Sequence, residues 1–306
     1  MSVNSNGDNN TDYKYEYAKT LLTDLKSKYI YIPLPIIMNN NLDVKRVAAF
    51  SYLRIHCGLN DLIGFTVSDM VTFCGMKPNN REGKINDKFL NVVDEFNNKG
   101  YLTYLTEKDK NSFIKCKLDM EYYYNQCSDG YAIVYLDELQ KIMDYKNLQG
   151  NSIDNSIILL VFAYLRNKIK RRPNELKPEE RTLEGIEKRR KRLPEAISSN
   201  ITTIAKELGV HKQTLSKAID ILEYDLKLIV TDRAYRVKNE NGEFRTLPTI
   251  FANAYKREDR YLLVTDNNYS RMEIELKVEN IKQYYQDYKI DKRKRKTYKI
   301  TQIKRK

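Results

Sequence analysis

Apolar and polar residues follow the periods of strands and helices along most of the chain. The first group contains a short strand at 29–32, a largely apolar helix at about 43–57, and amphipathic helices at 66–74 and 84–99. A hairpin is expected at 101–118, between two runs rich in β-forming residues. The pattern therefore predicts three helices followed by a hairpin.

The same pattern returns in the second half of the chain. The segment Phe50-Ser51-Tyr52-Leu53-Arg54 recurs as Phe162-Ala163-Tyr164-Leu165-Arg166, and a strand at 133–136 precedes the second copy as the strand at 29–32 precedes the first. A repeat with a period of about 112 residues indicates a duplicated domain rather than a solenoid. We therefore expect an α+β, mainly α, fold of two winged helix-turn-helix domains in tandem.

The second copy differs from the first by one long insertion. Its opening helix, expected at 154–170, is apolar on all sides and should form the core. A basic insertion at 170–199 follows, and a connection of that length is usually functional or disordered. The remaining elements are two helices and three wing strands, with Asn241-Gly242 as a hairpin signal; they are expected at 202–208, 211–224, 228–231, 235–238 and 244–250.

Four segments follow from these patterns. They are a disordered N-terminus with a short helix, a first winged-helix domain, a second one that carries the insertion, and a C-terminal helix with a disordered basic tail, at 1–28, 29–128, 129–270 and 271–306. The longest apolar run has nine residues, Ile157 to Leu165, whereas a membrane helix needs about 20. We expect a soluble, cytoplasmic protein that does not interact with membranes.

Positive charge is concentrated in two segments. The chain has a formal net charge of +13, and residues 166–192 carry 12 basic and 5 acidic side chains, while residues 289–306 carry 10 basic and 1 acidic. The remaining 261 residues sum to −3, and residues 30–125 are almost neutral, with 12 basic and 11 acidic side chains. Two basic arms on a nearly neutral body suit a polyanion that is bound through its phosphates, although basic tails can also be merely solvated.

Metal and catalytic chemistry find little support. Tyrosine-based nickases need a His-hydrophobe-His pair and tyrosine recombinases need a His-x-x-Arg group, but the chain has only His56 and His211, and neither fits. There is no phosphate loop of the GxxxxGK[ST] type. The cysteines form no metal-ligand pair, so we expect reduced and mostly buried thiols at Cys57, Cys74, Cys116 and Cys127. We expect a protein that is not an enzyme and uses no cofactor or metal.

The strongest functional motif lies at 203–222. Gly209 suits the positive φ of the turn between the two helices, and the small Ala205 permits their close crossing. An apolar seam is expected from Leu208, Val210, Leu215, Ile219 and Leu222. Polar side chains of the lengths that reach base edges and phosphates remain outside, and Gln213 could pair with adenine.

This segment resembles the helix-turn-helix of many bacterial regulators. With the duplicated Phe-x-Tyr-Leu-Arg helices and the Asn241-Gly242 wing, the whole chain resembles the replication initiators of plasmids, phages and other mobile elements. The resemblance implies a sequence-specific double-stranded DNA-binding protein. A transcriptional repressor and a non-enzymatic nucleic-acid adaptor are the alternatives.

The resemblance also implies partners for the two domains. The first domain could form a homodimer or contact DNA weakly, and replication proteins could bind the chain. The expected DNA contacts lie on the second helix-turn-helix, the wing, the insertion and the tail: His211, Lys212, Gln213, Thr214, Ser216, Lys217, Arg233, Arg236, Lys238, Arg245, Arg171, Arg172, Arg189, Arg190, Lys191, Arg192, Lys292, Arg293, Lys294 and Arg295.

Overall fold

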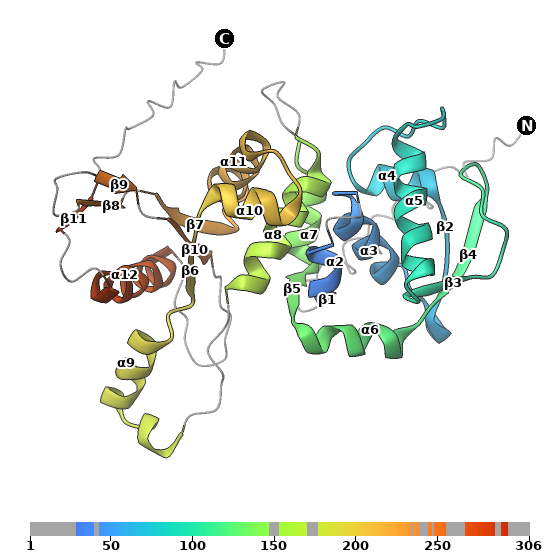
Figure 1. Cartoon of the computed structure of the whole chain (residues 1–306). Helices are drawn as coiled ribbons and strands as arrows, with labels where there is room; N and C mark the ends of the chain where they lie inside the picture. The colour runs from blue at the N-terminus through green and yellow to red at the C-terminus, as the bar shows by residue number, and fades with distance from the viewer. Residues whose placement is uncertain are drawn as a thin grey trace, which may run out of the picture. The chain divides into compact units, whose positions relative to one another are not determined.

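The chain is an α+β protein with four small antiparallel sheets among the residues that the computed structural model describes (Figure 1). These residues are 29–39, 43–146, 153–169, 177–233, 235–238, 244–246, 248–254, 267–284 and 289–292, with the backbone alone described at 59, 235–238, 244–246, 267–269, 282–284 and 289–292. The short helix expected within 1–28 lies outside them. Two compact units are present, one formed by 1–168 with 204–228 and the other by 169–203 with 229–306.

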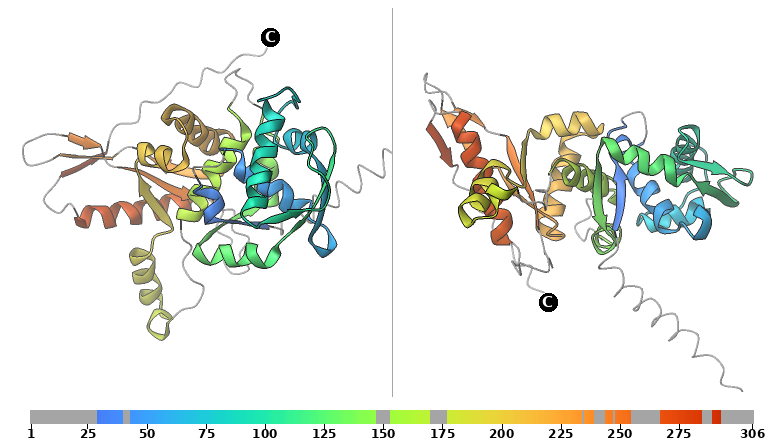
Figure 2. Two further views of the ribbon diagram at one scale, coloured as in Figure 1. Left: turned by 45° about the vertical axis from the view of Figure 1, so that its right-hand side comes forward. Right: turned by 90° about the horizontal axis from the view of Figure 1, so that it is seen from below.

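The first unit begins with the first copy of the repeat. Its elements are β1 (Tyr29–Pro33), α2 (Leu34–Ile37), α3 (Arg46–Ile55), η1 (Leu59–Asp61), β2 (Leu62–Thr66), α4 (Val67–Phe73), α5 (Ile85–Asn98), β3 (Leu102–Tyr104) and β4 (Phe113–Leu118). The sheet has the order β2-β4-β3, and α5 contacts its edge strand β3 (Figure 2). The three helices and the hairpin are thus where the periodicity predicts them. The strand β2 was not predicted.

The unit continues into the second copy through α6 (Met120–Gln126) and η2 (Cys127–Asp129). It then contains β5 (Tyr131–Tyr135), α7 (Leu136–Met143), α8 (Asn155–Lys168), most of α10 (Ile201–Leu208), α11 (Lys212–Asp220) and the π-helical turn η4 (Ile221–Asp225). The helix α8 is buried on all sides from Ile158 to Leu165, which confirms it as a core helix. The helices α6 and α7 were not predicted.

The two copies meet through equivalent elements. The strands β1 and β5 pair antiparallel about Tyr31 and Ile133, and α3 packs against α8. Alternation along the strands directs Ile30, Ile32, Ala132 and Val134 into the core and the tyrosines outward. The duplicated segments therefore share one core in this unit.

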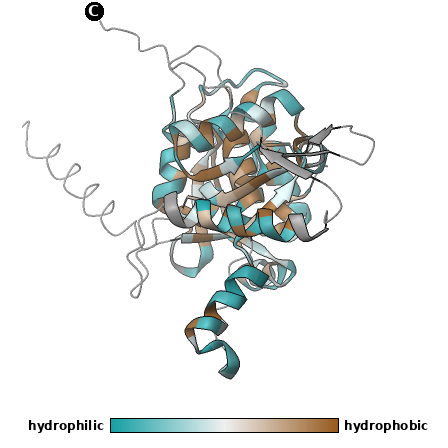
Figure 3. Cartoon of the chain, turned by 90° about the vertical axis from the view of Figure 1, so that its left-hand side faces the viewer, coloured by the Kyte–Doolittle hydropathy of each residue, from teal (hydrophilic) through white to brown (hydrophobic). Residues whose placement is uncertain are grey.

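The second unit contains a three-stranded sheet with the order β6-β10-β7, formed by β6 (Ala196–Ser199), β10 (Thr249–Asn253) and β7 (Ile229–Asp232). The helix α12 (Asn267–Tyr284) covers this sheet and contacts all three strands. Its Ile274 and Val278 pack on Ala196, Ile250 and Ala252. Hydrophobic patches mark these strands and α12 in Figure 3, whereas α9 is mostly hydrophilic. The C-terminal helix expected within 271–306 is thus present and begins earlier, at Asn267.

Three expectations need correction in this unit. The insertion 170–199 is not a plain loop, because it contains η3 (Pro178–Glu180), α9 (Leu183–Arg192) and β6; the Thr182 hydroxyl caps α9 by accepting the Gly185 N–H at 3.0 Å. The last wing strand is divided into β9 (Phe244–Thr246), which pairs with β8 (Tyr235–Lys238), and β10, which pairs with β6 and β7. The start of the basic tail is not disordered, since Lys289–Lys292 forms β11 and pairs with β8.

Candidate nucleic-acid interface

The second helix-turn-helix has the internal geometry that its sequence predicts. Gly209 has a φ of +68°, the left-handed conformation that glycine adopts without strain. Ala205 is buried at the crossing of α10 and α11. The predicted seam is buried at Leu208, Leu215, Ile219 and Leu222, whereas Val210 is only half-buried. The seam leaves one side of α11 free to face solvent.

The outer side of α11 is polar and lacks acidic residues in its first turn. His211, Lys212, Gln213 and Lys217 are exposed, and Thr214 and Ser216 are half-buried beside them. His211 is the N-cap, and its Nδ1 accepts the Gln213 N–H at 3.4 Å. The partial positive charge of the helix start therefore adds to Lys212 and Lys217. An end of this kind attracts phosphate.

The basic residues of α9 are held in ion pairs. Arg189 is buried, with its Nε 3.4 Å from a carboxylate oxygen of Glu180. Arg192, although largely exposed, donates to the other oxygen of Glu180 at 2.7 Å. The two arginines bind the same carboxylate, so their charges hold α9 against η3.

The middle of the same basic run is paired as well. Arg190 lies 3.5 Å from the buried Glu273 of α12, and Lys191 lies 3.1 Å from Glu187 one turn away. Sequence counting predicts a strongly cationic arm here. In the structure, carboxylates lie against four of these charges, those of Arg189, Arg190, Lys191 and Arg192.

The wing and tail are described mainly through their backbones. Arg233 is half-buried after β7, while Arg236 and Lys238 lie on β8, Arg245 on β9 and Lys292 on β11. The pairing of β11 with β8 places Lys292 opposite Tyr235. No sequence signal indicated that the tail and the wing share a sheet. The remaining candidates lie outside the described residues: Arg171, Arg172, Arg293, Lys294 and Arg295.

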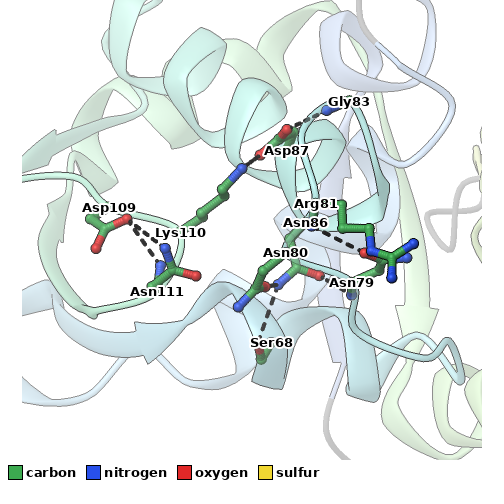
Figure 4. Close-up of polar contacts among 10 residues, drawn as sticks. All are labelled: Ser68, Asn79, Asn80, Arg81, Gly83, Asn86, Asp87, Asp109, Lys110 and Asn111. Atoms are coloured by element: carbon green, nitrogen blue, oxygen red, sulfur yellow. Dashed lines mark hydrogen bonds and ion pairs between the residues drawn. The ribbon is translucent and has the colours of Figure 1, made fainter.

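The equivalent turn of the first copy is long but well organised (Figure 4). The buried Asn86, near the start of α5, accepts the Asn79 N–H at 2.9 Å through its side-chain oxygen. Its amide nitrogen donates to Ser68 on α4 at 3.2 Å and also to the side chain of Asn80. The sequence shows only a polar loop of Asn, Lys and Gly. One buried amide therefore fixes the path of this turn.

A carboxylate occupies the start of α5. Asp87 accepts hydrogen bonds from the Gly83 N–H at 2.6 Å and from the ammonium group of Lys110, in the loop between β3 and β4, at 2.7 Å (Figure 4). The hydrogen bond from Lys110 is the main cause that lowers the pKa of Asp87. An internal anion thus stands where α11 has none, which disfavours phosphate at this helix start.

The four cysteines are free thiols. Cys74 and Cys116 are buried, as expected, but Cys57 and Cys127 are only half-buried. Burial raises the pKa of Cys116 to about 12, so its thiol stays protonated and weakly nucleophilic. We assign these thiols to packing.

Three further observations concern metal ligands, membrane helices and similarity to known proteins. Within the described part of the chain, no group of three or more His, Cys, Asp or Glu side chains is arranged to hold a metal ion. No described helix has the length and apolarity needed to cross a bilayer. No protein-family model, curated protein or solved structure matches the chain. The case for a function rests on the geometry of α10 and α11.

Proposed function

We propose that the chain is a non-enzymatic, sequence-specific protein that binds double-stranded DNA through α11. The supporting observation is the division of α11 into a buried apolar side and an exposed side of hydrogen-bonding groups, after a turn closed by Gly209. A helix in the major groove needs this division. Gln213 is exposed in the first turn, where its amide can reach the N6 and N7 atoms of adenine.

We also propose that both copies are winged helices. In each copy a helix, a strand, two helices and two strands follow in that order, as α3-β2-α4-α5-β3-β4 and as α8-β6-α10-α11-β7-β10. Both three-stranded sheets place the last of these strands in the centre. In this proposal β8 and β9 extend the second wing, and β11 adds the root of the basic tail to it.

A replication initiator of a mobile element is the specific role that we favour. Duplication with divergence supports it, because Asp87 and the near-neutral charge of the first copy suit a contact with protein more than one with phosphate. In this role the first copy contacts a second copy of the chain or replication proteins. A transcriptional repressor that uses the same α11 is the alternative.

Selection of bound fragments from a random double-stranded DNA library tests this function. An initiator should recover an array of direct repeats, whereas a repressor should recover a single palindrome. The Gln213→Ala variant should lose about 1–3 kcal/mol of discrimination at one base pair. Gln140→Ala removes the same side chain from an exposed position on α7 and should change nothing.

Two results would reject direct readout. The first is recovery of no common sequence from the library, which would favour an adaptor that binds nucleic acid without selectivity. The second is equal discrimination by the Gln213→Ala and Gln140→Ala variants.

A further inference from the structure

The end of α10 is held by a buried cation from the first copy. Arg46 of α3 is completely buried, and it donates to the carbonyl oxygens of Ile36 and Ile37 at 2.9 and 2.8 Å. Its Nη2 also lies 3.5 Å from the carbonyl oxygen of Leu208, the last residue of α10. Burial lowers the pKa of Arg46 to about 10, so the side chain is charged at neutral pH. A cation at the carbonyl ends of α2 and α10 is favourable for both helices.

A second contact joins α10 to the core helix α8. The hydroxyl of Tyr164, which lies in the second Phe-x-Tyr-Leu-Arg segment, donates to Glu207 at 2.6 Å. The ammonium group of Lys168 lies 5.5 Å from the centre of the Tyr164 ring and 4.0 Å from Glu207. Burial of Tyr164 and its bond to Glu207 raise the pKa of the hydroxyl, which therefore stays a donor at neutral pH.

A third contact lies beyond the other end of α11. The hydroxyl of Tyr145 donates to Asp225 of η4 at 2.5 Å. Tyr145 is itself held in place, because the buried Asn155 of α8 donates to the carbonyl oxygens of Met143 and Tyr145 at 2.8 and 3.1 Å. Between the two held ends, α11 packs on α8.

From these contacts we propose that Arg46, Tyr164 and Tyr145 are positioning residues that fix the orientation of α11. Arg46 and Tyr164 hold α10, and Tyr145 holds η4, which follows α11. None of the three lies on the exposed side of α11, so each acts through the backbone that carries Gln213. The effect on DNA reading rests on the proposed function. The mechanical role, which is to fix the orientation of α11, does not.

Bidentate pairing explains why orientation matters. An amide that pairs with two atoms of one base loses its advantage when its helix rotates, whereas a lysine on a flexible stem keeps its phosphate. Loosening α10 and α11 should therefore reduce discrimination between bases and leave the salt dependence of binding nearly unchanged. Simple loss of stability would not produce that combination.

The test is Tyr164→Phe, with Tyr104→Phe as the matched control. Tyr104 is a half-buried tyrosine whose hydroxyl donates to Asp94 of α5 at 2.9 Å, so its loss removes the same kind of bond in the first copy. Both variants keep the ring and should fold. Backbone hydrogen exchange and binding to the selected DNA, with and without a substitution at the base pair read by Gln213, are measured for each.

We expect Tyr164→Phe to speed exchange within 204–225 and to reduce discrimination by about fivefold, with the slope of affinity against salt unchanged. Tyr104→Phe should speed exchange only within 85–98 and keep discrimination at the wild-type value. Wild-type discrimination in Tyr164→Phe would overturn the proposal. If the wild-type protein has no DNA preference, the proposed function fails, and exchange decides alone: faster exchange within 204–225 supports the mechanical role, and unchanged exchange rejects it.

Discussion

The turn between α4 and α5 packs against the start of α8. One added methyl group can test that contact. Gly75 ends α4 with a φ of +71°, and a Cβ atom there would lie 2.9 Å from the Asn155 side-chain nitrogen and 3.0 Å from the Met143 carbonyl oxygen. Gly83, in the same loop, has a φ of +68°, and its added Cβ would meet nothing within 4 Å. The two glycines share the backbone conformation and differ in their surroundings.

The expected costs follow from that difference. An alanine in the left-handed region costs about 1–2 kcal/mol, which is the whole effect expected for Gly83→Ala. Gly75→Ala carries the same strain, and in addition it presses on a backbone carbonyl and on the Asn155 amide that holds Met143. Overpacking of this kind costs about 1–3 kcal/mol. Gly75→Ala should therefore lower the free energy of unfolding by about 1–3 kcal/mol more than Gly83→Ala.

Urea unfolding followed by far-UV circular dichroism, with exchange measured across α7 and α8, gives both quantities. The first unit should carry the loss, because both glycines belong to it. Equal costs for the two variants would refute the close approach of the first turn to α8. Faster exchange at the start of α8 in Gly75→Ala alone would support it.

Two further predictions concern buried polar groups. Burial raises the pKa of Tyr52 and of Cys116 to about 12. The unfolded chain therefore loses these protons at a lower pH than the folded protein does, so the contribution of these two groups to the free energy of unfolding should be constant below about pH 9 and should fall as the pH rises toward 12. Urea midpoints measured at increasing pH test this. Phenolate absorbance that titrates with a single midpoint at the ordinary tyrosine pKa would contradict this. Asn86→Ala should cost about 1–3 kcal/mol and speed trypsin cleavage at Arg81, whereas the exposed Asn98→Ala should do neither; equal cleavage rates would argue against the amide network.

Local patterns predicted the elements that have strong local signals. Several elements lie close to the expected ranges, because their apolar residues recur at helical or strand spacing. They are the helices α4, α5, α8, α10 and α11 and the strands β1, β5 and β7. The left-handed Gly209 and the buried Leu215 and Ile219 followed from the spacing of the helix-turn-helix. Each of these features is determined within about 20 residues.

Features that depend on distant partners were missed. β6 is a short strand whose pairing with β10 joins residues 50 to 56 positions apart, from Ser199 with Thr249 to Ala196 with Ala252. α9 lies in the basic insertion for which no helix was predicted, and Glu180 and Glu273 supply the carboxylates that hold it. The sharing of one core by both copies also depends on the pairing of β1 with β5, which no local pattern encodes.

The two copies of the repeat differ most at the start of the helix that follows the turn. In α5 that start carries Asp87, which forms an ion pair with Lys110, and the Asn86 amide bonds to Ser68 on α4. In α11 the first turn has no acid, and the polar side chains face outward. A carboxylate at a helix start repels phosphate and weakens the attraction of the helix dipole for it. The Asp87 contacts that stabilise this turn would, in the proposed function, also disfavour phosphate there, which suits a copy whose proposed task is to carry Arg46 and hold α11 in place.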